Sequence, residues 1–300
     1  MIVAGYPSAR RSARNPQQRL RRTPARGPFV QYGLDHTRRI PSDRGCAITV
    51  AAGAGAFGAY LREHLEAIEE RNAVTLDRLA DALLATVRNG GLVHVGGTGH
   101  STGLLLETFY RAGGLACVQP LYDQGLSPLE GAVASTARER TSGLAERILR
   151  QAAPDTGDLG IVFSNSGTNP VPVELAQGLS RRGCTVAAVC SLEHLRQAPR
   201  RSDAKLDEIA DLVLDTGAPE GDVAYAAGPH HTAPVSSLAG VYLWSLALAR
   251  LADRAAAAGI DLPLWQSTNV ADGEARNEAT IAAFGPRIPR LSVSGPDGEE

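Results

Sequence analysis

The stretch DLGIVFSNSGTN at residues 158–169 decides the fold class of this chain. The apolar run at its centre predicts a buried strand, because the central strands of a parallel sheet are covered on both faces and read as continuous hydrophobic runs. A Ser/Gly-rich loop follows, and Pro170 then stands in the first turn of the next predicted helix, where its missing N–H costs nothing. A strand, a small-residue loop and a helix in this order are typical of an α/β protein.

The same pattern occurs earlier, in LVHVGGTGHS at residues 92–101, and apolar strands alternate with helices between and beyond the two stretches. We predict strands at residues 92–95, 115–118, 158–163, 184–190 and 210–214. We predict helices at residues 56–88, 101–111, 135–152, 170–183 and 236–258, with a possible break at Asn72 in the first. Residues 119–134 and 217–235 read as loops, and an irregular tail follows the last helix. The predicted fold is a doubly wound five-stranded parallel sheet of flavodoxin-like order, preceded by a helical segment.

In the strand order 2-1-3-4-5, ligands bind beyond the carboxyl ends of the first and third strands, and both Ser/Gly loops fall there. Glycines allow close backbone approach, and amides at helix N-termini attract anions. We therefore predict a phosphate site held by neutral donors. The predicted binding residues are Thr98, Gly99, His100, Ser101, Ser164, Asn165, Ser166, Gly167, Thr168, Asn169 and Ser236. The alternative is that Ser101 and Asn169 are only helix N-caps and the glycines are only turns.

Two nucleotide-binding readings of the first loop fail on their own residues. Thr102 stands where a dinucleotide fingerprint has its third glycine, and no Asp or Glu ends the predicted second strand, which runs into Gln119 and Pro120. Neither loop carries the lysine of a phosphate-binding P-loop.

The net charge of −2 hides an asymmetry between the start of the chain and the rest. Residues 1–50 carry ten arginines against two acids, so the remaining residues are acidic, which argues against a nucleic-acid-binding surface there. We expect a disordered basic extension at residues 1–55, one domain at 56–290 and a disordered tail at 291–300. Alternatives are that the extension is an arm that binds nucleic acid or a membrane, or that translation starts near Val50.

No metal site, cofactor or membrane anchor is expected. The four cysteines have no metal-ligand spacing, and three fall in or beside predicted strands, where cysteine acts as a small hydrophobe. The longest apolar run, near residues 235–251, is interrupted by polar residues and reads as a buried helix. Since the sequence shows neither a signal-peptide core nor a disulfide framework, a cytoplasmic location is expected.

Three side chains are the candidates for catalysis. Glu107 lies among apolar neighbours in a predicted helix, although Arg111 at i+4 offers it an ion pair. Glu130 lies in the loop expected over the mouth of the site, and His231 in the loop after the fifth strand. A carboxylate in a partly apolar pocket suits proton abstraction next to a carbonyl, and a histidine suits ring opening or oxyanion stabilisation.

At these motifs the chain resembles the SIS (sugar isomerase) domain family, and within it a bacterial phosphosugar-binding branch, over about residues 57–290. The motifs that carry the resemblance are GTGHS at 97–101, ETFYRAGGL at 107–115, EG at 130–131, SNSGTN at 164–169, GD at 221–222, PVSS at 234–237 and STN at 267–269, with Gly273 and Asn277. The SNSG loop is the most specific of these for SIS domains.

The resemblance implies a five-stranded parallel sheet, phosphosugar binding and a homodimer in which the partner subunit completes the site. It leaves the reaction open, because SIS proteins include isomerases, a lyase and sugar-sensing regulators. We expect an enzyme that removes the C2 proton of an aminohexose 6-phosphate such as N-acetylglucosamine 6-phosphate, followed by elimination or isomerisation. The alternative is a sensor that binds the same ligand without catalysis.

Overall fold

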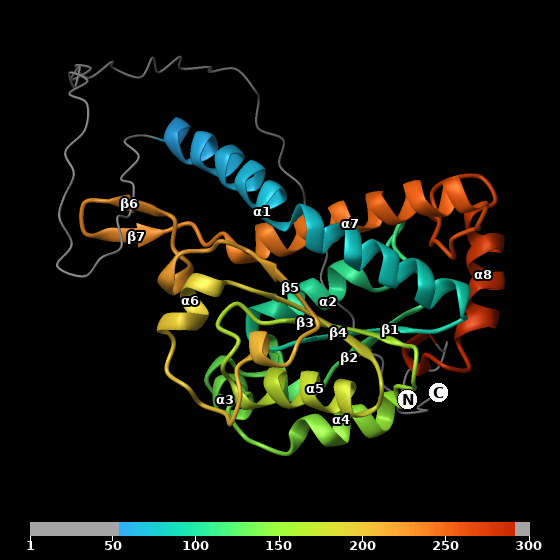
Figure 1. Ribbon diagram of the computed structural model, residues 1–300, viewed down its shortest axis with the longest axis horizontal. Coiled ribbons are helices and arrows are strands. Elements are labelled where there is room, and N and C mark those ends of the chain that lie inside the picture. Colours follow the sequence, from blue (N-terminus) through green and yellow to red (C-terminus); the bar gives the residue numbers. More distant parts are fainter. Residues whose placement is uncertain (1–53, 292–300) are drawn as a thin grey trace, which may run out of the picture. The chain divides into compact units, whose positions relative to one another are not determined.

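A computed structural model describes residues 54–291, which contain a five-stranded parallel sheet with helices on both faces (Figure 1). The strands of this sheet are β1 (Val93–Gly97), β2 (Val118–Leu121), β3 (Leu159–Phe163), β4 (Thr185–Cys190) and β5 (Leu212–Asp215). The α-helices are α1 (Ala54–Arg88), α2 (Thr102–Thr108), α3 (Ala132–Arg138), α4 (Leu144–Ala152), α5 (Pro170–Arg181), α6 (Leu192–Gln197), α7 (Ser236–Ala258) and α8 (Gly273–Phe284). The predicted basic extension, the Val50 start and the tail lie outside the described residues, except that α1 begins at Ala54 and a short 3-10 helix, η6 (Pro289–Leu291), ends the described chain.

The strand order is β2-β1-β3-β4-β5, and every neighbouring pair is parallel, so the predicted fold class is confirmed. Val93 at the start of β1 pairs with Val118 of β2 on one side and with Leu159 of β3 on the other. Because β1 and β3 are neighbours in register, their carboxyl ends and the two Ser/Gly loops lie at the same edge of the sheet.

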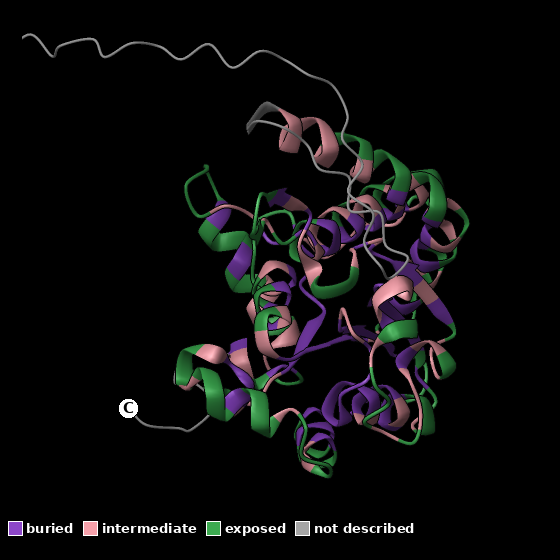
Figure 2. Ribbon diagram, turned by 90° about the vertical axis from the view of Figure 1, so that its left-hand side faces the viewer, coloured by how far each residue is buried: buried purple, intermediate pink, exposed green. Residues whose placement is uncertain are grey.

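Two apolar layers fill the space between the sheet and its helices. One face packs against α1, α2 and α7, with Phe163 and Trp244 among its buried side chains, and the other packs against α4 and α5. Figure 2 shows the buried strands in the interior and the exposed residues on the outer helices. Among the described residues, no helix is both long and apolar enough to span a bilayer.

Helices α1 and α7 run parallel to each other across the sheet. The polar pairs between them show this, because the residue numbers of both partners increase from one pair to the next. The Tyr242 hydroxyl donates to Glu69, Arg250 donates to Asp77 at 2.8 Å, and Arg254 donates to Asp81 at 2.6 Å. The predicted break at Asn72 is wrong, because α1 is one continuous helix. Asn72 is buried, and its amide hydrogen-bonds the backbone of β5, which explains a polar residue in the apolar face.

The second strand is displaced from its predicted position. Residues 113–116 pair with residues 263–265, as in the 2.7 Å hydrogen bond from the Ala116 amide to the Pro263 carbonyl, and β2 starts only at Val118. Pro120, expected in a loop, lies inside β2, which is possible because β2 is an edge strand. No Asp or Glu ends β2, as predicted; the first acid beyond it is Asp123, two residues after Leu121, and Arg138 and Arg147 pair with its carboxylate.

Three further predictions of local structure are corrected. The predicted helix at 135–152 is divided into α3 and α4, and Gly143 between them adopts a left-handed φ of 90°. The predicted loop at 217–235 contains a two-stranded antiparallel hairpin, β6 (Tyr225–Ala227) and β7 (His230–Thr232). The predicted irregular tail contains α8, whose Asn277 side chain bonds both backbone groups of Gln266. In each of these three segments the hydrophobic periodicity of the sequence is weak, and a turn or a side-chain contact determines the local structure instead.

Three cysteines, Cys117, Cys184 and Cys190, are buried and free, as predicted for small hydrophobic residues. Burial raises the pKa of the Cys117 and Cys190 thiols to about 12 and that of Cys184 to about 11. These groups are therefore protonated and unreactive at neutral pH.

A buried polar pair joins His94 of β1 to Asp158, the residue that directly precedes β3. His94 Nε2 lies 2.9 Å from Asp158 Oδ2, and the Leu92 amide donates to Asp158 Oδ1 at 2.8 Å. Burial is the largest influence on the pKa of Asp158 and raises it, but hydrogen bonds from His94, Leu92 and Asp155 together outweigh burial and hold the pKa below its ordinary value.

We expect Asp158→Asn to lower the free energy of unfolding by about 2 kcal/mol at neutral pH, since the amide cannot accept all these hydrogen bonds. A carboxyl with a lowered folded-state pKa stabilises the fold above its unfolded-state pKa, and this contribution is lost as pH falls through the folded-state pKa. Urea unfolding from about pH 7 down to about pH 3 should therefore show the two proteins converging in acid. A difference that stays constant over this range would contradict the assignment.

Candidate functional site

The first Ser/Gly loop connects β1 to α2 through a short 3-10 helix, η1 (Gly99–Ser101). Gly99 has a φ of 58°, and a Cβ on Gly97 would lie 2.8 Å from the Ser101 carbonyl oxygen, so both positions require glycine. The Thr98 side chain makes no cap hydrogen bond to η1 and donates instead to Glu139. This geometry holds the backbone of the loop close against the start of α2.

The second loop connects β3 to α5. Gly167 has a φ of 61°, and a Cβ there would lie 2.5 Å from a methyl group of Leu195. The Ser164 hydroxyl oxygen accepts from the Gly167 amide at 3.3 Å, so its own proton stays free for a ligand. Thr168 is fully buried, and its hydroxyl has no partner among the described residues.

A cavity of about 30 Å³ joins the two loops at the switch point. It is lined by His100, Ser101, Leu104, Phe163, Ser164, Asn165, Val189, Thr216, Ser236, Ser237 and Gly240. Five of the predicted binding residues, His100, Ser101, Ser164, Asn165 and Ser236, therefore meet around one space. This volume is about that of one water molecule, so a larger ligand must lie over the cavity and reach into it.

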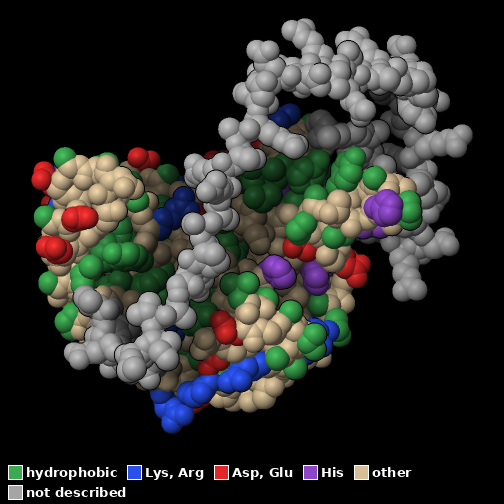
Figure 3. Space-filling model, turned by 180° about the vertical axis from the view of Figure 1, so that it is seen from behind, with side chains coloured by type: hydrophobic (Ala, Val, Ile, Leu, Met, Phe, Trp, Pro, Cys, Tyr) green, Lys and Arg blue, Asp and Glu red, His purple; other side chains and the backbone are tan. Residues whose placement is uncertain are grey.

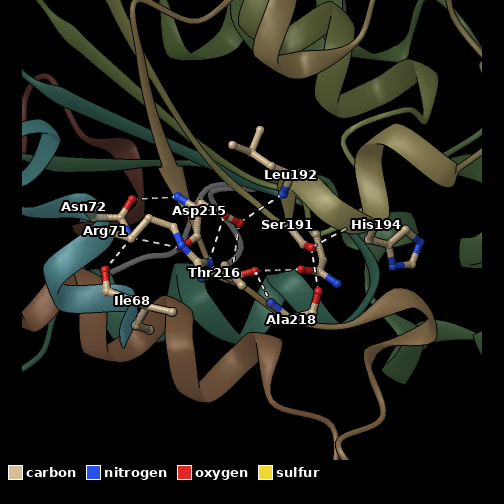
Figure 4. A network of polar contacts seen from close by, with 11 residues as sticks. Ile68, Arg71, Asn72, Ser191, Leu192, His194, Asp215, Thr216 and Ala218 are labelled. Atoms are coloured by element: carbon tan, nitrogen blue, oxygen red, sulfur yellow. Dashed lines mark hydrogen bonds and ion pairs between the residues drawn. The ribbon is translucent and has the colours of Figure 1, made fainter. Parts of the chain in front are cut away.

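The orientation of Asn165 is fixed by its hydrogen bond with Thr216. Figure 4 shows the polar network that connects Thr216 and Asp215 to Asn72 and Arg71 of α1. The Thr216 hydroxyl donates to Asn165 Oδ1 at 3.1 Å and accepts from the Ala218 amide. Thr216 directly follows Asp215, whose backbone N–H and carbonyl both bond the side chain of Asn72. With its oxygen engaged, the Asn165 amide presents its Nδ2 donor, which has no partner within residues 54–291.

The Asp215 carboxylate closes the same network. It accepts from the Leu192 amide at 3.0 Å and from the Gly217 amide at 2.9 Å, while Arg71 pairs with its other oxygen at 3.0 Å. The loops after β4 and β5 are thus bonded to each other and to α1. This rigid support lies directly behind the cavity.

Glu139, which follows α3, connects the two Ser/Gly loops. Its carboxylate accepts from the Thr98 hydroxyl at 2.9 Å and from Asn169 Nδ2 at 2.8 Å, and its carbonyl accepts from the Val171 amide at 3.1 Å. Arg201 donates to the other side of the Asn169 amide at 3.0 Å. One carboxylate thereby sets the spacing between the loops.

Ser101 and Asn169 occupy the N-cap positions of α2 and α5, but side-chain capping does not account for them. Neither Ser101 nor Asn169 makes a side-chain capping hydrogen bond. In the second loop, the amides of Asn165, Ser166 and Thr168 donate to no group within the described part of the chain. Unpaired amides before a helix are the usual receptor for an anion.

Ser236 differs from the other predicted hydroxyl donors. Asp222 accepts from its hydroxyl and from its amide, the latter at 2.8 Å, so Asp222 caps the start of α7. The proton of Ser236 is used within the protein, and its hydroxyl offers the cavity a lone pair.

None of the three predicted catalytic side chains lines the cavity. Glu107 forms the i+4 ion pair with Arg111 on the surface of α2. Glu130 is exposed at the end of the 3-10 helix η3 (Pro128–Glu130), and His231 is exposed on the hairpin. Figure 3 shows histidine side chains both on the hairpin and in the middle of the same face. Their catalytic roles remain predictions.

Sequence reasoning missed Glu139, Thr216, Asp222 and Arg201, because all four act on loops that are distant in the chain. Glu139 stands within an arginine-rich helix end, where a solvated carboxylate is the ordinary expectation. Asp222 had a signal in the sequence, since it belongs to the GD motif at 221–222 that contributes to the family resemblance.

Residues 56–191 match the family model of the SIS domain. The UPF0309 protein GK1441 of Geobacillus kaustophilus is 34% identical over 236 residues, which cover 77% of this chain and 94% of that protein. A UPF0309 protein of Listeria monocytogenes is 31% identical over 234 residues, covering 77% of this chain and 95% of that protein.

Two solved structures show a more distant likeness. Phosphoheptose isomerase GmhA from Neisseria gonorrhoeae is 15% identical, with a TM-score of 0.46 over 65% of this chain and 95% of that chain. The sugar isomerase domain of an RpiR transcription factor from Sphaerobacter thermophilus is 16% identical, with a TM-score of 0.40 over 76% of this chain and 96% of that chain.

Proposed function

Because the chain belongs to the UPF0309 family of SIS-domain proteins, we propose that it binds a phosphorylated sugar at the cavity between its two Ser/Gly loops. The observation that carries this proposal is a row of backbone amides, at Asn165, Ser166 and Thr168, that have no acceptor among residues 54–291 and lie in the loop that enters the N-terminus of α5. Amides and the positive end of a helix favour a compact anion.

The proposed pose follows from the size and the lining of the cavity. The phosphate lies over the small cavity with one oxygen reaching in between Ser101, Ser164 and the Asn165 amide group, and the sugar lies farther out, beside the exposed His100. Neutral donors of this kind suit a sugar monophosphate better than a nucleoside triphosphate with magnesium.

The proposed reaction is removal of the C2 proton of an aminohexose 6-phosphate, such as N-acetylglucosamine 6-phosphate, followed by elimination or isomerisation. The proposed base is Glu107 or Glu130, and His231 is the proposed histidine. Since these side chains do not line the cavity of their own chain, we propose that a second copy of the chain supplies at least one of them.

The positions of the three predicted catalytic side chains, all outside the cavity, support a second candidate function. A chain whose predicted catalytic groups all lie outside its cavity is suited to binding without chemistry, so a phosphosugar sensor is the alternative. In this case Glu107→Gln and Glu130→Gln should leave affinity unchanged.

An NMR time course with N-acetylglucosamine 6-phosphate in D₂O tests these proposals. Deuterium at C2, or a new unsaturated or isomeric product, is expected for the enzyme, and the two glutamine variants then identify the base. Line broadening without exchange is expected for the sensor. If neither signal appears with this sugar or with a panel of other sugar phosphates, phosphosugar binding is refuted.

A homodimer is the expected assembly, and the surface that carries Glu130 supports it. Leu129 is 92% exposed and Val133 is 86% exposed, and both lie beside Glu130 in the chain. We expect Leu129→Asp with Val133→Asp to turn the dimer into a monomer, measured by light scattering after gel filtration, because exposed apolar clusters of this kind mark interfaces. The control is Val74→Asp, at a 73% exposed position on α1. A double variant that keeps the wild-type mass would place the interface elsewhere.

A further inference from the structure

A second, larger cavity of about 740 Å³ lies at the β2 edge of the sheet and shares no residue with the cavity between the loops. Its walls are β2, the turn after it, α4 and η6. The lining residues are Gln119, Pro120, Tyr122, Asp123, Gln124, Arg147, Ile148, Gln151, Ala152, Pro289 and Arg290. Cavities of about 300–1,000 Å³ are the usual size of small-molecule sites.

The charges at this cavity favour an anion. The Asp123 carboxylate pairs with Arg147 and lies 3.5 Å from Arg138 Nε. Arg290 holds its guanidinium 4.7 Å from the centre of the Tyr122 ring and pairs with no carboxylate in the described part of the chain. Among the lining side chains, the guanidinium groups of Arg147 and Arg290 face one carboxylate, that of Asp123, which leaves an excess of one positive charge.

Gln119 provides a second, independent observation. Its side chain lines the cavity and is only 5% exposed, yet its buried Oε1 has no hydrogen-bond partner among the described residues. Its neighbour in register on β1 is His94, whose Nδ1 also lacks a partner while Asp158 holds its other nitrogen. Buried polar atoms without partners are rare and costly, so each one requires an explanation. A bound molecule whose N–H or O–H donor reached the Gln119 oxygen would give it the missing partner.

We propose that this cavity is a binding site for a nucleoside monophosphate. Arg147 and Arg290 bind the phosphate, since guanidinium groups offer paired N–H donors to phosphate oxygens. The amides of Gln119 and Gln151 hydrogen-bond the edge of the base, since a carboxamide offers a donor and an acceptor side by side, as bases do. The proposal does not depend on the proposed phosphosugar function, because the two cavities are separate.

Calorimetric titration of the full chain with AMP, GMP, CMP and UMP tests the proposal. We expect at least one nucleotide to bind with one site per chain, and ribose 5-phosphate and inorganic phosphate to bind at least tenfold more weakly. Excess N-acetylglucosamine 6-phosphate should not displace it. Absence of binding by all four nucleotides, equal binding of inorganic phosphate, or displacement by the sugar phosphate would each overturn the assignment.

Variants locate the bound nucleotide. Arg147→Gln together with Arg290→Gln should weaken binding at least tenfold, whereas Arg182→Gln, an ion-paired arginine outside the cavity, should not. Gln119→Leu should weaken binding at least tenfold without lowering the melting temperature of the free protein, since an unpaired buried amide is replaced by an apolar side chain. Undiminished affinity in both the arginine and the glutamine variants would place the nucleotide elsewhere and refute the site.

Discussion

Glu139→Ala is expected to weaken sugar-phosphate binding roughly 10- to 100-fold, or about 1.4 to 2.8 kcal/mol. The carboxylate is the shared acceptor for Thr98 of the first loop and Asn169 of the second, at 2.9 and 2.8 Å. Without it, each loop keeps its own backbone but loses its position relative to the other. Binding then has to include the cost of ordering the site, and calorimetry with N-acetylglucosamine 6-phosphate measures the loss.

Glu174→Ala is the matched control for this experiment. Glu174 lies on α5 and accepts a backbone amide, that of Gly143, at 2.8 Å, but it contacts neither loop. Its removal should leave affinity unchanged, and the conservative Glu139→Gln should be intermediate because it keeps one acceptor oxygen. Equal affinities of Glu139→Ala and the wild type would show that the loops hold their spacing without this carboxylate.

Asn72→Leu is expected to have the largest effect on stability, about 3 kcal/mol in the free energy of unfolding. The leucine removes three hydrogen bonds of the Asn72 amide and leaves the buried N–H and carbonyl of Asp215 unpaired. Urea unfolding at neutral pH measures the change. Since Thr216 follows Asp215 and orients Asn165, ligand affinity should fall as well.

Arg71→Ala provides the comparison on the same helix. Arg71 pairs with the Asp215 carboxylate, but its side chain is 48% exposed, and ion pairs in such positions contribute about 0–1 kcal/mol. Asn72→Leu should therefore lower the free energy of unfolding several times more than Arg71→Ala does. The reverse order would mean that the charge, rather than the buried amide, anchors β5 to α1.

The sheet order and the meeting of the two loops could be predicted from sequence because each rests on a local signal. Apolar runs locate the strands, and the order of a doubly wound sheet then places the ends of the first and third strands together. The start and end of α7 also matched the prediction, since its apolar periodicity is long and Gly259 ends it with a left-handed φ of 63°.

What could not be predicted depends on contacts between distant residues. Asn72 resembles a helix break in sequence, and only its bonds to a strand 143 positions away show that it is a buried anchor. Residues 115–118 read as a strand, but the chain near residue 264 competes for the same backbone and displaces β2 toward Leu121. Nothing in the sequence distinguishes Glu139 from other surface carboxylates, because its contacts with Thr98 and Asn169 form only in the folded chain.

The parallel packing of α1 and α7 has a consequence for the growing chain. During synthesis α1 and both Ser/Gly loops leave the ribosome well before α7, which supplies Leu243 and Leu251 to the same apolar layer as Leu76 and Leu83. Until residue 258 has emerged, the leucines of α1 that pack against α7 remain exposed to solvent. Before β5 has formed, Thr216 is not in place to hydrogen-bond Asn165. A fragment limited to residues 56–191 would therefore contain both loops and still lack an assembled site, so the C-terminal third belongs to the folding unit as much as the loops do.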